Sequence, residues 1–307
     1  MNPLRGIVLK ILSVTIFTGM AAIIKATADE VPAGERVFFR SLFAIPPILV
    51  WLAMRHDFPG GLRTSNIAGH IWRSLVGVTA MGCGFLALGL LPFPEMVALG
   101  YAAPLLTVIF AAMFLGERLR IYRMAAVALG LVGVMIVLSP RLTVLEPGQV
   151  TDAETLGATI ALTGAVFVAL ATVFVRKLVQ TEATPAIVFY FSVFAALLSL
   201  VTLPWGWVMP GWQTFGLLVL AGLLGGVGQI CLTEAYRHAE TAVIAPFDYT
   251  SMLLAIAVGF FVFAEIPTMP ILSGAALVVT AGLFIIWRER QLGLKRGAAR
   301  RIVTPQG

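Results

Sequence analysis

An aspartate within a membrane-length apolar stretch is the residue in this chain best placed to bind a polar solute. The stretch, residues 240–265, places Tyr249, Ser251 and Met252 beside Asp248. A carboxylate in a spanning helix costs about 2.5–3.5 kcal/mol on insertion scales, so it normally faces a bundle interior or a wet cavity and has a partner. We therefore expect Asp248 and these three neighbours to line a solute-binding site.

A cation within another apolar stretch is the alternative partner for Asp248. Arg40 stands about six residues below the outer end of its stretch, so its long side chain can turn inward or snorkel to the membrane surface. Lys25 is nearer its helix end, where snorkelling is the expected behaviour. Either cation, or a backbone group, would satisfy Asp248 without a ligand.

Two tyrosines occupy corresponding places in two apolar stretches, and each stretch also contains a proline. Tyr101 lies close to Pro104, and Tyr249 lies close to Pro246. The two phenol rings could stack on a flat ring of a ligand, or they could pack between helices with each hydroxyl bonded to a backbone carbonyl. Each proline removes a backbone hydrogen bond and loosens its helix, and transporters often hold substrate at broken helices. Pro104 and Pro246 are therefore candidate helix-break or gating positions.

The composition is that of an integral membrane protein. Of 307 residues, 59% are hydrophobic and 12% are charged, whereas soluble domains have about 25% charged residues. The net charge of +6 does not indicate nucleic-acid binding, because the basic residues lie in short segments between apolar runs. Cys83 and Cys231 both lie inside apolar runs and form no metal-binding or disulfide spacing.

Motifs for energy-driven or catalytic chemistry are missing from the sequence. No lysine follows a glycine, so a phosphate-binding Walker A loop has no place in the chain. Neither HExxH nor GxSxG occurs. We therefore expect no catalytic residue, no metal and no cofactor, and an ATP-driven pump or an intramembrane hydrolase is not predicted.

Windows of about 20 apolar residues predict ten membrane spans. The predicted spans are residues 7–27, 34–54, 70–90, 96–115, 121–138, 155–175, 184–203, 213–234, 242–263 and 270–287. If the N-terminus is cytoplasmic, most of the 21 lysines and arginines fall on the cytoplasmic side, so both termini are predicted to lie there. The first apolar run also has features of a signal peptide, but the repeat described next requires it as a span.

A shift of 148 residues superimposes the two halves of the chain. It places Tyr101 on Tyr249, and it lays Asp248 over Gly100, so the carboxylate has no twin. Each half then holds five spans, and because five is odd the second half enters the membrane inverted. The predicted fold is an all-α membrane protein with ten transmembrane helices in two inverted five-helix repeats. Its predicted parts are a first repeat at 1–140, a periplasmic linker at 141–154, a second repeat at 155–287 and a basic cytoplasmic tail at 288–307.

A pair of glycines in the eighth predicted span, Gly222 and Gly226, has the small-xxx-small spacing that permits close contact between helices. We expect another helix to approach this span closely there.

Particular sequences in both halves resemble a known family. The ending Phe114-Leu115-Gly116-Glu117, the run from Ala235 to Met252 and the ten-span plan are similar to the drug/metabolite transporter superfamily, EamA type. The resemblance covers nearly the whole chain, although Ala264 replaces the glycine that the family often has before Glu265. It implies a multi-pass protein of the bacterial inner membrane that moves a small organic metabolite across the lipid bilayer by alternating access. A homodimer is compatible with this plan, and no nucleic acid is expected.

The substrate is less well indicated than the class. The ninth-span sequence, APFDYT, is most similar to family branches that take up riboflavin or S-adenosylmethionine. Riboflavin is the first expectation, because paired tyrosines could sandwich its flat ring while Arg40 or Asp248 contacts its polar tail. S-adenosylmethionine would suit a carboxylate because its sulfonium is cationic, and amino-acid or drug transport is a further alternative. A non-transporting membrane scaffold or sensor subunit is the alternative from another class.

Overall fold

The computed structural model describes residues 3–56, 58–115, 121–142, 152–178, 181–238 and 245–302. Within these ranges every regular element is an α-helix or a 3-10 helix, as predicted. In chain order the elements are α1 (Pro3–Ala26), α2 (Ala33–Leu42), α3 (Ile45–Met54), η1 (Gly60–Leu62), α4 (Ile67–Leu90), α5 (Phe93–Gly100), α6 (Ala102–Leu115), α7 (Ile121–Leu142), α8 (Asp152–Leu178), α9 (Thr184–Ser199), η2 (Leu200–Trp205), α10 (Trp212–His238), η3 (Ala245–Tyr249), α12 (Thr250–Phe263) and α13 (Met269–Ile302).

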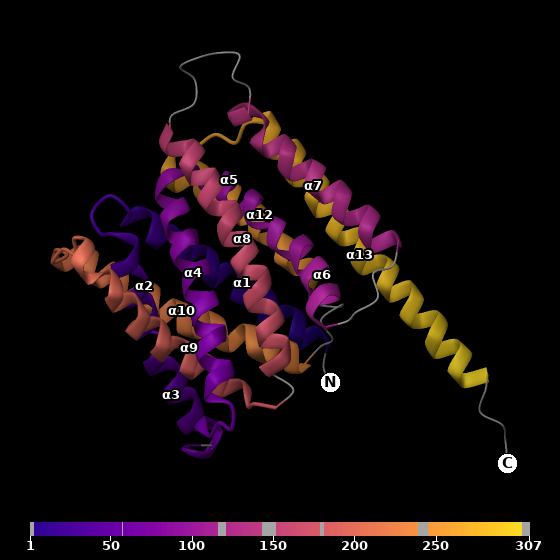
Figure 1. The fold of residues 1–307 in the computed structure, drawn as a ribbon, viewed down its shortest axis with the longest axis horizontal. Coiled ribbons are helices and arrows are strands. Elements are labelled where there is room, and N and C mark those ends of the chain that lie inside the picture. The colour runs from indigo at the N-terminus through magenta and orange to yellow at the C-terminus, as the bar shows by residue number, and fades with distance from the viewer. Residues whose placement is uncertain are drawn as a thin grey trace.

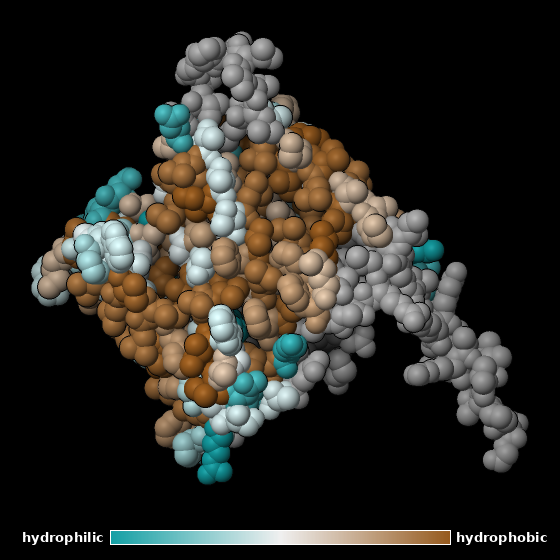
Figure 2. Space-filling model, viewed as in Figure 1, coloured by the Kyte–Doolittle hydropathy of each residue, from teal (hydrophilic) through white to brown (hydrophobic). Residues whose placement is uncertain are grey.

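The described helices carry the apolar surface of a multi-pass membrane protein. Six segments are long and apolar enough to cross a membrane: Leu4–Ala26, Ala33–Met54, Ile67–Leu90, Asp152–Val175, Pro185–Trp205 and Trp212–Leu232. Three shorter apolar helices accompany them, Val127–Ser139, Phe247–Phe263 and Met269–Phe284. Apolar side chains also cover most of the face seen in Figure 2. Apolar surface this extensive needs lipid around it.

Prolines separate α2 from α3, and tryptophans lie at the end of η2 and the start of α10. Pro46 and Pro47 open α3 and supply no N–H groups, so α2 ends at Leu42 and the predicted span 34–54 is two helices in sequence. Trp205, the last residue of η2, is 74% exposed, and Trp212, the first residue of α10, is 91% exposed. Exposed tryptophans at a helix end are typical of a membrane–water interface.

Three long helix pairs join the two halves of the chain. Helix α1 packs along α10, α4 packs along α8, and α7 packs along α13. The α7–α13 pair runs side by side at one edge of the molecule, and α1 begins at the same end of the bundle at which α13 ends (Figure 1). Helix α2 contacts α4, α9 and α10, and α4 also contacts α9, so these four helices form a group at the other edge.

Helix boundaries recur in the two halves at one fixed interval. Helix α12, Thr250–Phe263, begins and ends 148 residues after α6, Ala102–Leu115, and α13 begins 148 residues after α7. A break therefore precedes α6 and α12 at matching places, just after Tyr101 and Tyr249.

Glycines bring α10 close to the α2–α3 segment. A Cβ on Gly222 would overlap the side chain of Phe43, and a Cβ on Gly226 would lie 2.8 Å from the carbonyl oxygen of Ala44. The close contact predicted from the small-xxx-small spacing is confirmed.

Candidate functional site

The predicted break near Pro104 is present, and it falls at Tyr101. Helix α5 ends at Gly100, Tyr101 caps it with φ −68° and ψ −7°, and α6 begins at Ala102. Proline has no N–H for the carbonyl four residues earlier, and its ring crowds that carbonyl, which here belongs to Gly100. Pro104 therefore stands in the first turn of a new helix, where its missing donor costs little.

The second break carries the candidate polar residues. Pro246 lies in η3, a 3-10 segment that gives way to α12 at Thr250. The Thr250 hydroxyl donates to the Phe247 carbonyl at 2.6 Å, and the Ser251 hydroxyl donates to the Asp248 carbonyl at 2.7 Å. These two bonds satisfy carbonyls at the junction between the two kinds of helix, where backbone partners change.

The two tyrosines touch one another. Their ring centroids are 5.3 Å apart with planes at 68°, an edge-to-face contact, and the Tyr101 hydroxyl lies 2.7 Å from the Ser251 hydroxyl oxygen. The Tyr249 ring points at α13, where a Cβ on Gly282 would overlap its hydroxyl. In this arrangement no flat ring fits between Tyr101 and Tyr249, so the geometry matches the helix-packing alternative.

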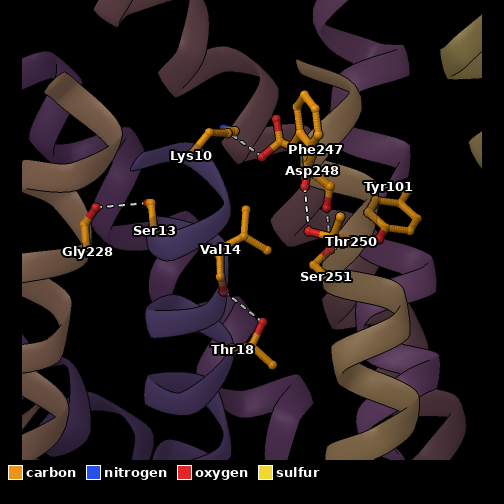
Figure 3. Close-up of polar contacts among 10 residues, drawn as sticks. All are labelled: Lys10, Ser13, Val14, Thr18, Tyr101, Gly228, Phe247, Asp248, Thr250 and Ser251. Atoms are coloured by element: carbon orange, nitrogen blue, oxygen red, sulfur yellow. Dashed lines mark hydrogen bonds and ion pairs between the residues drawn. The ribbon is translucent and has the colours of Figure 1, made fainter. Parts of the chain in front are cut away.

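Asp248 is paired with a lysine that the sequence did not single out. The Lys10 ammonium of α1 lies 2.7 Å from Asp248 Oδ1, with the lysine side chain 3% exposed and the aspartate side chain 49% exposed (Figure 3). The alternative in which Asp248 pairs with Arg40 or Lys25 is wrong, because Lys10 is its partner and Lys25 pairs with Glu265. Lys10 stands near the start of the first predicted span, residues 7–27, and belongs to the basic residues that the topology places toward the cytoplasm. Its place inside a predicted span could have marked Lys10 as a candidate partner for Asp248.

Helix α1 is fixed beside this ion pair by a buried hydroxyl. Ser13, which is fully buried, donates to the Gly228 carbonyl of α10 at 2.9 Å (Figure 3). Thr18, further along α1, donates its hydroxyl to the Val14 carbonyl, so its hydroxyl proton is already used within the helix. Helix α1 thus lies between α10 and the broken helix, with Lys10 aimed at Asp248.

A second ion pair joins α1 to the far end of α12. Lys25 lies 2.9 Å from Glu265 and also donates to the carbonyls of Leu91 and Leu88 at 2.6 and 3.3 Å. Glu265 in turn accepts the backbone N–H of Phe93 at 2.6 Å. The predicted snorkelling of Lys25 is wrong, because carbonyls at the end of α4 and a carboxylate supply its partners within the protein.

Of the remaining candidates, Met252 lies at this site and Arg40 lies in a different part of the bundle. Met252 is 6% exposed and lines, with Tyr249, a mostly apolar cavity of about 390 Å³ between α12 and α13. Arg40 is 7% exposed and turns inward among α2, α9 and α10, so it does not snorkel. The structure therefore brings Asp248, Tyr249, Tyr101, Ser251 and Met252 together and places Arg40 elsewhere.

The polar cluster at these breaks can bind a solute through charge and hydroxyl groups. It offers one carboxylate, one ammonium and hydroxyls of Tyr101 and Ser251 at a contact between the two halves of the chain. Among the described residues no group of three or more His, Cys, Asp or Glu side chains could hold a metal ion.

The sequence profile of the EamA-like transporter family matches residues 4–139 and again residues 155–287. The chain belongs to the EamA-like transporter family. This family lies within the drug/metabolite transporter superfamily, so the resemblance noted in the sequence is confirmed.

Proteins similar to this chain are named for the transport of different solutes. The chain is 29% identical to the pseudopaline exporter CntI of Pseudomonas aeruginosa, covering 90% of this chain and 94% of that protein. It is 26% identical to the S-adenosylmethionine uptake transporter of Rickettsia felis, covering 83% and 82% of the two chains. It is 30% identical to a riboflavin transporter of Rhizobium johnstonii, covering 82% and 78%.

A solved crystal structure shares the fold at 20% identity, with a TM-score of 0.64, covering 94% of this chain and 98% of the other.

Proposed function

We propose that this EamA-family protein is a secondary transporter that moves a small organic metabolite across the bacterial inner membrane by alternating access. The proposed architecture has ten spans in two inverted five-helix repeats, residues 1–140 and 155–287, with a periplasmic linker at 141–154 and both termini in the cytoplasm. The matching breaks before α6 and α12 support it, because broken helices at related places in two repeats commonly form the substrate site of a transporter.

For the substrate we propose a solute that carries both an ammonium and a carboxylate, as S-adenosylmethionine does in its amino-acid group. The observation that carries this proposal is the pairing of Lys10 with Asp248 beside two hydroxyls. A zwitterion can replace each partner of the ion pair with its own opposite charge, so neither protein charge is left uncompensated when the pair opens. A neutral solute cannot do this.

Uptake of S-adenosylmethionine into proteoliposomes tests this proposal. Wild-type protein should accumulate labelled solute above empty vesicles, and Asp248→Asn should reduce the rate about tenfold or more, because bonds to charged groups contribute about 1.5–3 kcal/mol. Asp152→Asn is the matched control, since Asp152 is an exposed acid in the first turn of α8. Equal rates in the two variants would remove Asp248 from the site. A protein that moves no zwitterionic solute and co-purifies with a fixed partner would instead indicate a scaffold or sensor subunit.

Riboflavin uptake is the second candidate, and one relative favours it. The riboflavin transporter of Rhizobium johnstonii is 30% identical to this chain. The edge-to-face contact of Tyr101 with Tyr249 requires that riboflavin bind without a sandwich between them, or after they separate. Growth of a riboflavin auxotroph that lacks its own uptake system, on low external riboflavin, decides this candidate. Failure of rescue despite good expression would exclude riboflavin.

A further inference from the structure

A cavity of about 390 Å³ lies between α12 and α13. One wall comes from residues 249–256, and the other comes from residues 272–279 of α13. Helix α13 packs along α7 but makes few direct contacts with α12, the helix that precedes it in the chain. Protein interiors contain few voids larger than a water molecule, so a space of this size between two helices indicates an occupant.

The cavity opens on the apolar outer surface of the molecule. Met252 and Ala275 are buried at its floor, whereas Leu253, Leu272 and Ala276 are exposed at its mouth. These residues belong to the ninth and tenth predicted spans. In the proposed topology the mouth therefore faces the hydrocarbon of the bilayer and not water.

The corresponding helices of the first half are packed together at this place. Leu105 of α6 is 2% exposed, and a Cβ on Gly130 of α7 would overlap its side chain. Leu253, which stands 148 residues after Leu105, is 70% exposed. Val278 corresponds to Gly130 but packs against α7, where a Cβ on Gly133 would lie 2.7 Å from its Cγ2. The α12–α13 pair thus lacks the contact that joins α6 to α7.

The described wall of the cavity carries no charged side chain, and its polar side chains are Tyr249 and Thr250. The Thr250 hydroxyl donates to the Phe247 carbonyl, so its proton is already used. The Tyr249 hydroxyl points at α13, where a Cβ on Gly282 would overlap it. An apolar cavity with so few polar partners does not hold water. The wall therefore favours an apolar occupant.

An acyl chain of a membrane lipid fits these requirements. From Leu272 to Val279 the cavity extends about 10 Å along α13, at 1.5 Å per residue. Each leaflet supplies about half of the roughly 30 Å hydrocarbon core, so one chain is long enough to fill this length. Lipid chains also cover the surface around the mouth, so a chain enters without crossing a polar layer.

We propose that one acyl chain of a phospholipid binds in the cavity between α12 and α13. The chain contacts Tyr249 and Met252, which also belong to the candidate site, so the bound lipid supports the broken helix from the side of the membrane. Lys10 and Asp248 do not line the cavity, and the lipid site does not depend on the proposed substrate.

Thermal unfolding of the full-length protein, purified in detergent and washed free of lipid, tests the site. Dioleoyl phosphatidylglycerol should raise the unfolding midpoint until the effect saturates, because a ligand of the native state alone stabilises that state. Dihexanoyl phosphatidylglycerol has the same head group on short chains, and it should give at most a small shift. The comparison separates binding of the acyl chain from attraction of the anionic head group to basic residues.

Matched variants locate the effect. Ala276→Phe places a ring in the mouth of the cavity and should weaken the apparent affinity for the dioleoyl lipid roughly tenfold or more, because the ring takes the space of several buried methylene groups. Ala128→Phe should keep the wild-type affinity, since Ala128 is the exposed residue at the corresponding place on α7. Leu253→Ala removes part of the wall and should weaken binding several-fold; Leu253 is exposed, so this variant keeps the packed core.

Photocrosslinking in proteoliposomes shows where the chain lies. A phosphatidylglycerol with a diazirine in one acyl chain should label peptides that contain residues 272–279 several-fold more than peptides that contain residues 124–131, which correspond to them in the first half. Ala276→Phe should remove this preference.

Four results would overturn the proposal. Two of them are the absence of a saturable shift with the dioleoyl lipid and an equal shift with the dihexanoyl lipid. The third is wild-type affinity and labelling in both Ala276→Phe and Leu253→Ala. The fourth is a different occupant: displacement of the lipid by S-adenosylmethionine would place the cavity on the transport path, and a midpoint that depends on protein concentration but not on lipid would indicate a second copy of the chain.

Discussion

At the scale of single residues, the lysines and the arginines inside this protein have different surroundings. Lys10 and Lys25 meet the carboxylates of Asp248 and Glu265 at 2.7 and 2.9 Å. The guanidinium carbon of Arg40 instead lies 6.0 Å from the ring centroid of Phe191, and that of Arg73 lies 3.6 Å from the same centroid. The lysine pairs join separate helices, so their opening changes how the helices fit together. The Nε atoms of Arg40 and Arg73 are buried and make no hydrogen bond within the described part of the chain.

The coupling between Lys10 and Asp248 can be measured with a double-mutant cycle. Lys10→Gln, Asp248→Asn and the double variant should give a coupling energy of about 1–3 kcal/mol, because one partner is almost fully buried and the bond is charged on both sides. Denaturation of the purified protein in mixed micelles supplies the stabilities. Arg55 and Glu234 form the comparison pair, with Arg55 40% exposed, and their coupling should stay within about 1 kcal/mol. A smaller coupling for Lys10–Asp248 than for Arg55–Glu234 would contradict this prediction.

Residue types in the sequence predicted the location of the polar cluster but not its partners. An aspartate, a serine and two tyrosines in long apolar runs are visible as exceptions, so Asp248, Ser251, Tyr101 and Tyr249 could be selected in advance. Which lysine reaches Asp248 depends on how α1 packs between α10 and η3, and no local pattern encodes that packing. The contact of Arg73 with Phe191 likewise depends on how α4 packs against α9.

At the scale of elements, α1 and the broken helix formed by η3 and α12 are joined by ion pairs at both ends. Lys10 and Lys25 stand 15 residues apart on α1, which is about 22 Å along a helix. They meet Asp248 just before α12 and Glu265 just after it. Alternating access opens one end of a transporter at a time. In the proposed alternating-access cycle, the two ion pairs would open separately, one on each side of the membrane.

Opening one ion pair should expose α1 from one side only. In a protein whose native cysteines, Cys83 and Cys231, are replaced, Thr18→Cys places a thiol on α1 between the two pairs; Thr18 is 8% exposed. With the proposed orientation, Lys25→Gln should increase labelling of this thiol by a membrane-impermeant thiosulfonate added outside intact cells. The increase should be several-fold, because the pair and the carbonyl bonds of Lys25 close that end.

The control for this experiment is the opposite ion pair. Lys10→Gln, with the same Thr18→Cys, should leave labelling from outside at the level of the parent protein. Equal increases in both variants would mean that the pairs do not act as separate closures.

At the scale of the whole molecule, the number of spans in each half determines which side of the membrane each segment occupies. The boundaries of α6 and the start of α7 recur 148 residues later in α12 and α13, and the family profile matches each half separately. Five spans per half would invert the second half, whereas an even number would leave both halves in the same orientation. An inverted pair would bring the break before α6 and the break before α12 toward the same central region, and the contact between Tyr101 and Tyr249 at these two breaks supports this proposal.

Reporter fusions test this topology directly. With five spans in each half, alkaline phosphatase inserted within residues 141–154 should be active, because it folds only outside the cytoplasm, and the same enzyme fused after Gly307 should be inactive. Green fluorescent protein should give the opposite result at both positions. The basic residues at the end of the chain, including Arg296, Arg300 and Arg301, favour the cytoplasmic side for that terminus. An active phosphatase at both positions would mean that the second half crosses the membrane an even number of times. That result would contradict the inverted repeat, although the observed helix boundaries would stand.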